Sequence, residues 1–124
     1  MGKFILEGTP KTPKIIFYGD EGKFEISGRS IPENSSKFYL PVMNWVDQYL
    51  SSPATHTLIN VKLEYFNTSS LKSLVELFRK FEKLIDGTNQ VEIFWYYEEE
   101  DEDMMESGED FRQLLRIPLK LVKI

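Results

Sequence analysis

The residues best suited to chemistry are four small polar side chains in a row, Asn67-Thr68-Ser69-Ser70. They separate a run with the alternation of a β-strand from a run with helical spacing, so we expect them at the first turn of a helix. One such residue is enough to accept a hydrogen bond from the free N–H groups of that turn. A hydroxyl at a helix N-terminus is also a favourable place for a phosphate, because the helix dipole stabilises its charge of about −1.5 to −2. The run is therefore interpreted as a helix cap or as a phosphorylation site.

A second candidate is the acidic segment 98–110, which holds nine carboxylates and no lysine or arginine. Several carboxylates together can bind a divalent cation such as Mg²⁺, which would make the chain a metal-binding enzyme. The segment lacks the spaced Asp, Asn and Gly of a calcium loop. The plainer interpretation is a solvated loop that leads into a helix, whose first turn favours Asp and Glu. A third is a partner-binding surface, to which Met104 and Met105 add adaptable apolar contact.

Single residues elsewhere offer weaker candidates. His56 is the only histidine, and without a Ser–His–Asp pattern it is interpreted as a surface or strand-edge residue. Arg29, in the loop expected before the first long helix, is a candidate contact for a phosphate or a partner. Alternation along the strand assigns Trp95 to the core and leaves Tyr96 on the other face as a candidate partner contact. With no cysteine and no nucleotide-binding or HExxH motif, the sequence indicates no catalytic residue, cofactor or metal site.

Length and composition predict a single domain over residues 1–124. A hydrophobic fraction of 41% with 14% aromatic residues is enough for a core. No run reaches the roughly 18 apolar residues of a membrane helix, and the first residues lack a secretory apolar region. The absence of cysteine fits a reducing compartment. We therefore expect a cytoplasmic protein that does not bind a membrane.

The net charge of −5 is unevenly distributed. Of the 20 acidic residues, nine lie in segment 98–110, which leaves 11 against 15 basic residues in the rest of the chain. The chain is thus mildly basic with one acidic segment. Binding to a phosphate backbone requires concentrated positive charge, so nucleic acid is not expected as a partner.

The elements that must position these residues follow from periodicity. The N-terminal third is predicted to contain short strands at 3–7, 14–18 and 23–27, the last two joined by the turn residues 19–22. A Ser-x-x-Glu capping box from Ser30 to Glu33 predicts the start of a helix that ends near residue 52. Pro41 lies inside this pattern and should kink the helix or mark its first turn.

Strands and helices alternate in the rest of the chain. Residues 57–66 show the cleanest strand, in which the alternation places Tyr65 on the same face as Ile59, Val61 and Leu63. Next come a helix from the polar run to residue 85, a strand at 91–97, a short helix within 103–116 and a last strand at 118–124. Successive strand–helix units with short connections predict an α/β fold. We expect one mixed, partly parallel sheet of about five or six strands with helices packed on it.

Several motifs spread over nearly the whole chain carry a family resemblance. They are Ser27-Gly28-Arg29-Ser30, Pro32-Glu33-Asn34, Phe38-Tyr39 with Pro41 and Trp45, the run from Leu63 to Ser70, Trp95-Tyr96-Tyr97-Glu98, Asp101-Glu102-Asp103-Met104 and Gly108-Glu109-Asp110-Phe111. Together they resemble the SiaC-type regulatory phosphoproteins of bacteria, long classed as a domain of unknown function. Ile31 departs from the pattern, since an aromatic residue is expected there.

The resemblance implies a fold like the anti-sigma-factor antagonists of the STAS class, of which SpoIIAA is an example. It implies a non-catalytic switch in which a SiaB-like kinase phosphorylates Thr68 and a SiaA-like phosphatase of the PP2C type removes the phosphate. The unphosphorylated form would bind and activate a SiaD-like diguanylate cyclase, in cyclic-di-GMP signalling and the control of biofilm or aggregation. Asn67, Ser69 and Ser70 would shape the helix entrance. A phosphorylation-independent interaction module is the alternative.

Overall fold

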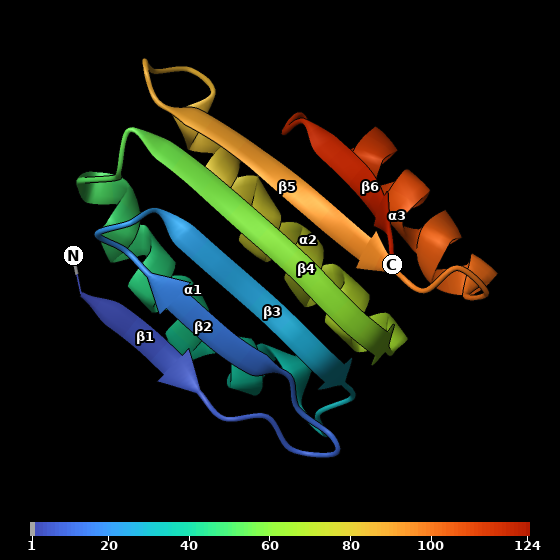
Figure 1. Cartoon of the computed structure of the whole chain (residues 1–124). Helices are drawn as coiled ribbons and strands as arrows, with labels where there is room; N and C mark the ends of the chain where they lie inside the picture. The colour runs from blue at the N-terminus through green and yellow to red at the C-terminus, as the bar shows by residue number, and fades with distance from the viewer. Residues whose placement is uncertain (1) are drawn as a thin grey trace.

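The computed structural model describes residues 2–124 and shows one six-stranded sheet covered by three α-helices (Figure 1). The elements are β1 (Lys3–Leu6), β2 (Lys14–Tyr18), β3 (Lys23–Ser30), α1 (Ser35–Ser51), β4 (His56–Phe66), α2 (Thr68–Phe81), the 3₁₀ helix η1 (Glu82–Leu84), β5 (Gln90–Tyr97), α3 (Glu102–Leu114) and β6 (Leu119–Lys123). The strands lie in the sheet in chain order. The first three pair antiparallel, whereas β3 to β6 pair parallel. The prediction of a mixed, partly parallel α/β sheet is confirmed.

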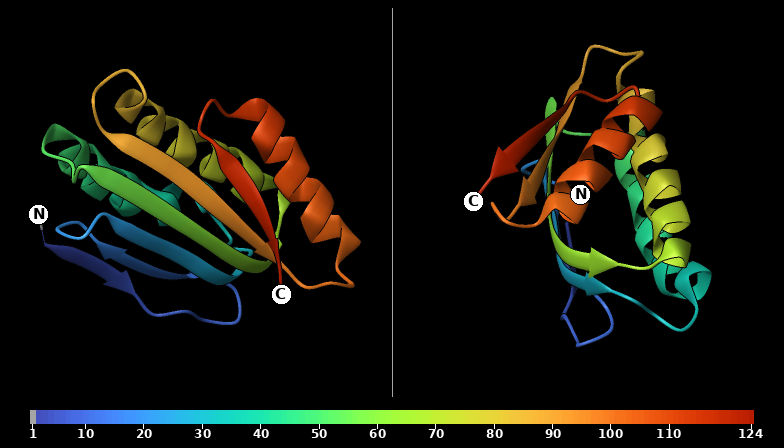
Figure 2. Two further views of the ribbon diagram at one scale, coloured as in Figure 1. Left: turned by 45° about the horizontal axis from the view of Figure 1, so that its top comes forward. Right: turned by 90° about the vertical axis from the view of Figure 1, so that its right-hand side faces the viewer.

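All three helices cover the same face of the sheet (Figure 2). Each of them connects two neighbouring parallel strands, and the connections move across the sheet in one direction. Since such crossovers are almost always right-handed, three successive steps in one direction place every helix on one side. The core therefore lies in a single layer between helices and sheet, and the opposite face of the sheet is open.

Helix α3 approaches the sheet closely at Gly108. A Cβ atom there would lie 2.4 Å from Cδ2 of Leu121 and 2.6 Å from Cδ1 of Trp95, so no larger residue fits without a shift. Trp95 is fully buried, as the alternation predicted, and its Nε1 donates to the carbonyl of Met104 at 3.0 Å. A buried indole N–H needs such a partner, so this bond fixes the start of α3 on the sheet.

A β-bulge interrupts the pairing of β3 and β4 near their ends. Gly28 faces Leu63 but the next residue, Arg29, faces Tyr65, which leaves Glu64 as an extra residue in β4. An extra residue reverses the side to which the following side chains point. Tyr65 is consequently 51% exposed, and Phe66 turns toward the core. The expectation that Tyr65 shares the buried face of Leu63 was wrong because alternation alone does not reveal a bulge.

The entrance of α1 also differs from its prediction. The N-cap is Asn34, whose Oδ1 accepts the N–H of Lys37 at 3.0 Å. Ser30 ends strand β3 and is fully buried, so the proposed capping box from Ser30 to Glu33 does not form. Pro41 lies within α1 rather than in its first turn, so only the other predicted role for it, a kink, is left.

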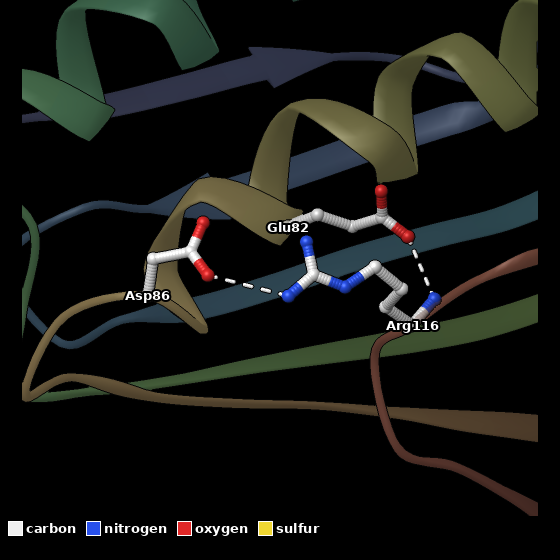
Figure 3. A network of polar contacts seen from close by, with 3 residues as sticks. All are labelled: Glu82, Asp86 and Arg116. Atoms are coloured by element: carbon white, nitrogen blue, oxygen red, sulfur yellow. Dashed lines mark hydrogen bonds and ion pairs between the residues drawn. The ribbon is translucent and has the colours of Figure 1, made fainter.

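The connection from α3 to β6 is tied to η1 and to the loop that follows it. The backbone N–H of Arg116 donates to Oε2 of Glu82 at 2.6 Å, and its guanidinium contacts Oδ1 of Asp86 at 3.2 Å (Figure 3). The side chains of Arg116 and Asp86 are exposed, so their ion pair adds little stability, on the order of 0–1 kcal/mol.

Among residues 2–124, no helix combines the length and apolar character needed to cross a membrane.

Candidate functional site

The predicted site residues gather at one edge of the sheet. Parallel strands end on the same side, so the C-termini of β3, β4 and β5 meet there, at Ser30, Phe66 and Tyr97 (Figure 1). The segments that follow these strands lead into α1, α2 and α3. This edge is where ligands and partners most often bind in α/β sheets. The polar run, Arg29, Tyr96 and the start of the acidic segment all lie along it.

Asn67 is the N-cap of α2. Its side-chain oxygen accepts the N–H of Ser70 at 2.9 Å and the hydroxyl of Ser69 at 3.2 Å. The N–H of Leu71 then bonds to the carbonyl of Asn67 at 3.1 Å and begins the helical pattern. The amides of Thr68 and Ser69 remain in the first turn, where a helix has no partner for them. These amides and the helix dipole make the turn electropositive.

Thr68 is the first residue of α2, and its side chain is exposed. Within residues 2–124, its hydroxyl makes no hydrogen bond. The other two hydroxyls of the run are engaged: Ser69 bonds to Asn67, and the fully buried Ser70 donates to the carbonyl of Ser30 at 2.9 Å. Thr68 therefore presents the one hydroxyl of the run that is both free and exposed. This residue is accessible from solvent without opening of the fold.

Arg29 lies in strand β3, not in a loop as expected, and the bulge places it beside Tyr65. Its guanidinium carbon is 5.8 Å from the centre of the Tyr65 ring, within the range of a cation–π contact. Tyr96 is also on the open face, where its hydroxyl donates to Oδ1 of Asn60 at 3.2 Å and Lys62 Nζ lies 5.1 Å from its ring centre. Arg29, Lys62 and Tyr96 line a shared hollow of about 390 Å³. Thr68, in contrast, starts the helix that covers the other face.

The acidic segment forms the entrance of α3. Asp101 is its N-cap and accepts the N–H of Met104 at 3.0 Å, while Glu102 and Asp103 occupy the first turn. This is the solvated loop and acidic first turn of the plainer interpretation. No three His, Asp or Glu side chains in the described part of the chain are grouped to hold a metal ion. Met104 is buried, so its side chain does not offer the partner surface proposed for it, whereas Met105 is half-buried.

His56 lies at the opposite edge of the sheet. It is the first residue of β4, its side chain is exposed, and its Nε2 is 3.3 Å from Oε1 of Glu92 on the neighbouring strand. The interpretation as a surface residue at a strand end is confirmed. Its distance along β4 from the polar run separates it from the candidate site.

The sequence analysis missed an apolar groove beside the polar run. The groove has a volume of about 510 Å³ and is lined by Phe66, Leu71, Ser107, Asp110, Phe111, Gln113 and Leu114. Leu71 is three residues after Thr68, so the two lie on neighbouring positions of the same face of α2. Leu114, at the end of α3, is 48% exposed. The arrangement of α2 and α3 in the fold, and no local sequence pattern, reveals that it borders an open groove.

Known proteins match the chain along almost its full length. A model of the SiaC family of regulatory phosphoproteins matches residues 6–124. An uncharacterized protein of Pseudomonas aeruginosa, strain UCBPP-PA14, is 29% identical over 121 residues, which is 98% of this chain and 96% of that protein. The structure of SiaC of P. aeruginosa superposes with a TM-score of 0.89 at 27% identity, covering 100% of both chains.

A further structure similar to this chain is of a complex. It is the crystal structure of the diguanylate cyclase SiaD of P. aeruginosa with its activator SiaC; the matching chain covers 98% of the present one and 99% of its own length, at 29% identity and a TM-score of 0.87. The family match covers far more than half of the chain, and the structural matches agree with it over the whole fold. The chain belongs to the SiaC family of regulatory phosphoproteins.

Proposed function

We propose that this chain is a non-catalytic signalling switch, set by reversible phosphorylation of Thr68. A partner kinase adds the phosphate and a PP2C-type phosphatase removes it. The unphosphorylated form binds and regulates an effector in the cytoplasm. The observation that carries the proposal is the placement of Thr68: an exposed, unbonded hydroxyl on the first residue of α2, followed by two serines whose hydroxyls are engaged.

The local physical chemistry supports a phosphate at this position. The modification adds about −1.5 to −2 charges and three acceptor oxygens. The free amides of the first turn and the positive end of the helix dipole stabilise that charge. Lys72 is four residues further along α2 and exposed, so its ammonium group can approach the phosphate along the helix surface. The fold can therefore accept the phosphate while the surface changes sharply in charge.

We further propose that the effector is a diguanylate cyclase, which links the switch to cyclic-di-GMP signalling. The support is the similarity to SiaC, which is the activator of SiaD in P. aeruginosa. The effector would contact the edge that carries Thr68, including Asn67, Ser69 and the open-face side chains Arg29 and Tyr96. A dianion introduced at such an interface has to be desolvated and repels nearby carboxylates, which favours release of the effector.

The test is phosphorylation of the purified chain by its partner kinase and ATP, followed by intact mass and peptide fragmentation. One phosphate per chain is expected on the parent, none on Thr68→Ala, and one on the control Ser69→Ala, whose side chain is also exposed. Labelling of Thr68→Ala to the level of the parent would contradict the assignment. Such a result would leave Ser69 or a site outside the polar run.

The effector step needs a separate measurement. Calorimetry with SiaD of P. aeruginosa as the probe compares the parent with its Thr68-phosphorylated form and with Thr68→Asp. We expect binding of the parent, loss of binding on phosphorylation and partial loss for Thr68→Asp, because aspartate has less charge and fewer acceptor oxygens than phosphate. Equal affinity of all three forms would favour a phosphorylation-independent interaction module instead.

A further inference from the structure

A chain of buried hydroxyls lies directly beneath the Thr68 turn. Tyr39 of α1, Ser30 of β3 and Ser70 of α2 are each fully buried. The oxygens of Tyr39 and Ser30 are 2.6 Å apart, and Ser30 Oγ donates to Ser70 Oγ at 2.8 Å. Ser70 Oγ donates in turn to the carbonyl of Ser30 at 2.9 Å. Since each hydroxyl has one proton to donate, Tyr39 must be the donor to Ser30, and the direction of the whole chain is fixed.

Hydrogen bonds attach both ends of the Thr68 turn to a single residue, Ser30. At the start of the turn, the N–H of Asn67 donates to the carbonyl of Ser30 at 3.1 Å. At its end, Ser70 bonds to the same carbonyl and to the hydroxyl of Ser30. Thr68 and Ser69 lie between these two attachments and project outward. The free hydroxyl of Thr68 is therefore held on a turn whose ends cannot move independently of strand β3.

The order of donors and acceptors among the hydroxyls of Tyr39, Ser30 and Ser70 does not change with ordinary changes in pH. Burial raises the pKa of Tyr39 to about 12, so its phenol remains a proton donor in the folded protein under physiological conditions. In the described part of the chain, no buried side-chain nitrogen or oxygen lacks a hydrogen-bond partner. Removal of a single hydroxyl would thus leave the remaining members without a donor or an acceptor.

We propose that Tyr39, Ser30 and Ser70 are positioning residues for phosphorylation, a hydroxyl clamp that presents Thr68 rather than the neighbouring Ser69 to the kinase in the reactive position. The inference rests on the proposed function and adds the device that selects the acceptor. In the transfer, Thr68 Oγ1 bonds to the γ-phosphorus of ATP, the bond from that phosphorus to the β–γ bridging oxygen breaks, and ADP leaves. The hydroxyl proton passes to a base of the kinase.

Such a transfer is sensitive to the placement of the acceptor. Reacting atoms need to approach to about 3–3.5 Å in line, and a misplacement on the order of 1 Å can cost about a hundredfold in rate. The clamp makes no contact with the kinase, because its three side chains are buried. Its loss should therefore lower kcat more than it raises KM, which distinguishes positioning from docking.

The chain offers a matched control one turn further along α2. Ser73 is buried and shares a 2.8 Å hydroxyl–hydroxyl bond with Ser35 of α1, but this pair does not touch the Thr68 turn. Ser70→Ala and Ser73→Ala each remove one buried serine hydroxyl from the same helix. Tyr39→Phe removes only the first donor of the clamp and serves as a second variant if Ser70→Ala does not fold.

The experiment measures kcat and KM with the kinase that labels the parent, and locates the phosphate by peptide fragmentation. For Ser70→Ala we expect about a tenfold lower kcat and detectable phosphate on Ser69; for Tyr39→Phe, a smaller change in the same direction. Ser73→Ala removes a buried hydroxyl of the same helix yet should retain the parent kcat and modify Thr68 alone. Amide hydrogen exchange at residues 68–70 should accelerate in Ser70→Ala and not in Ser73→Ala.

The outcomes separate this inference from the one it depends on. If Ser70→Ala and Tyr39→Phe match Ser73→Ala in kcat, acceptor site and hydrogen exchange while the parent is labelled on Thr68, the clamp is overturned and the switch stands. If the parent itself receives no phosphate on Thr68, both fall together.

Discussion

Helices α1 and α2 both begin with an asparagine N-cap, but the two caps are attached differently to the sheet. Both helices follow a parallel strand at one edge of the sheet, and both begin with an asparagine that accepts the N–H three residues on, Asn34 at 3.0 Å and Asn67 at 2.9 Å. Asn67 comes directly after β4 and is bonded to Ser30 through its own N–H, whereas four residues separate β3 from α1. A cap alone thus does not make an acceptor site. The attachment of the turn to the sheet distinguishes α2.

The largest effect on this comparison is expected from Ser30→Ala. The substitution removes the hydroxyl of Ser30, which joins Tyr39 to Ser70, and leaves the buried phenol of Tyr39 without its acceptor. We expect a loss of about 3 kcal/mol in the free energy of unfolding, because an unpaired buried donor adds its desolvation cost to the lost bonds. The control Ser35→Ala breaks one hydroxyl pair of α1 and should cost about 1 kcal/mol. Urea denaturation of the two variants measures the difference, and equal losses would remove the distinction between the two entrances.

The second prediction concerns alkaline pH. In the unfolded chain Tyr39 ionises at its ordinary pKa of 10.0, whereas burial raises its pKa to about 12 in the fold. Its contribution to stability is therefore complete below pH 10 and is lost as the pH rises toward 12, by up to about 3 kcal/mol. The stability of Tyr39→Phe should fall less over this range than that of the parent. Parallel curves for the two proteins in urea titrations from pH 9 to 12 would show that Tyr39 does not act as a buried donor.

A smaller effect separates the two caps themselves. Asn34→Ala should destabilise the protein by about 1 kcal/mol and Asn67→Ala by about 1–2 kcal/mol, because Asn67 Oδ1 also accepts the hydroxyl of Ser69. Only Asn67→Ala should slow phosphorylation of Thr68. Thermal unfolding combined with initial phosphorylation rates checks both statements, and a slowed Asn34→Ala variant would argue that any loosening of the helices has the same effect.

The smallest expected change in stability comes from new charge at the exposed first-turn positions. Thr68→Asp and Ser36→Asp each place a carboxylate near the N-terminus of a helix, and each should stabilise the fold by about 0.3–1 kcal/mol. The two variants should nevertheless differ in function, since only Thr68→Asp is expected to weaken binding of SiaD. If Ser36→Asp weakens binding equally, the effector responds to charge anywhere along this edge.

Much of the fold could be predicted from the sequence, because the patterns that specify it are local. Strand alternation in β4 up to Leu63 and helical spacing in α2 both reflect burial against one shared core, and the structure has both elements where they were expected. Asn67-Thr68-Ser69-Ser70 was likewise placed at a helix entrance, by its polar composition and by the change from strand alternation to helical spacing around it. The buried state of Trp95 followed from the same two-residue period.

The errors share a physical cause, since each depends on a contact between distant segments. Ser30 has the composition of a cap, but it ends a strand and bonds to residues 9 and 40 positions away in the sequence. Met104 follows a run of carboxylates and yet packs into the core, at a point where its carbonyl receives the indole N–H of Trp95. Which hydroxyl of the polar run is free also could not be read from the sequence, as it is decided by the partners that Ser69 and Ser70 find in the fold.

With Glu64, strand β4 has one residue more than regular pairing with β3 requires, just before α2 begins. Deletion of Glu64 would remove the bulge and leave Tyr65 opposite Arg29 and Phe66 opposite Ser30, so both aromatic rings would keep their present sides. The strand upstream of the deletion would keep its pairing. The loss of one amino acid at this position is thus compatible with both the outward position of Tyr65 and the attachment of Asn67 to Ser30.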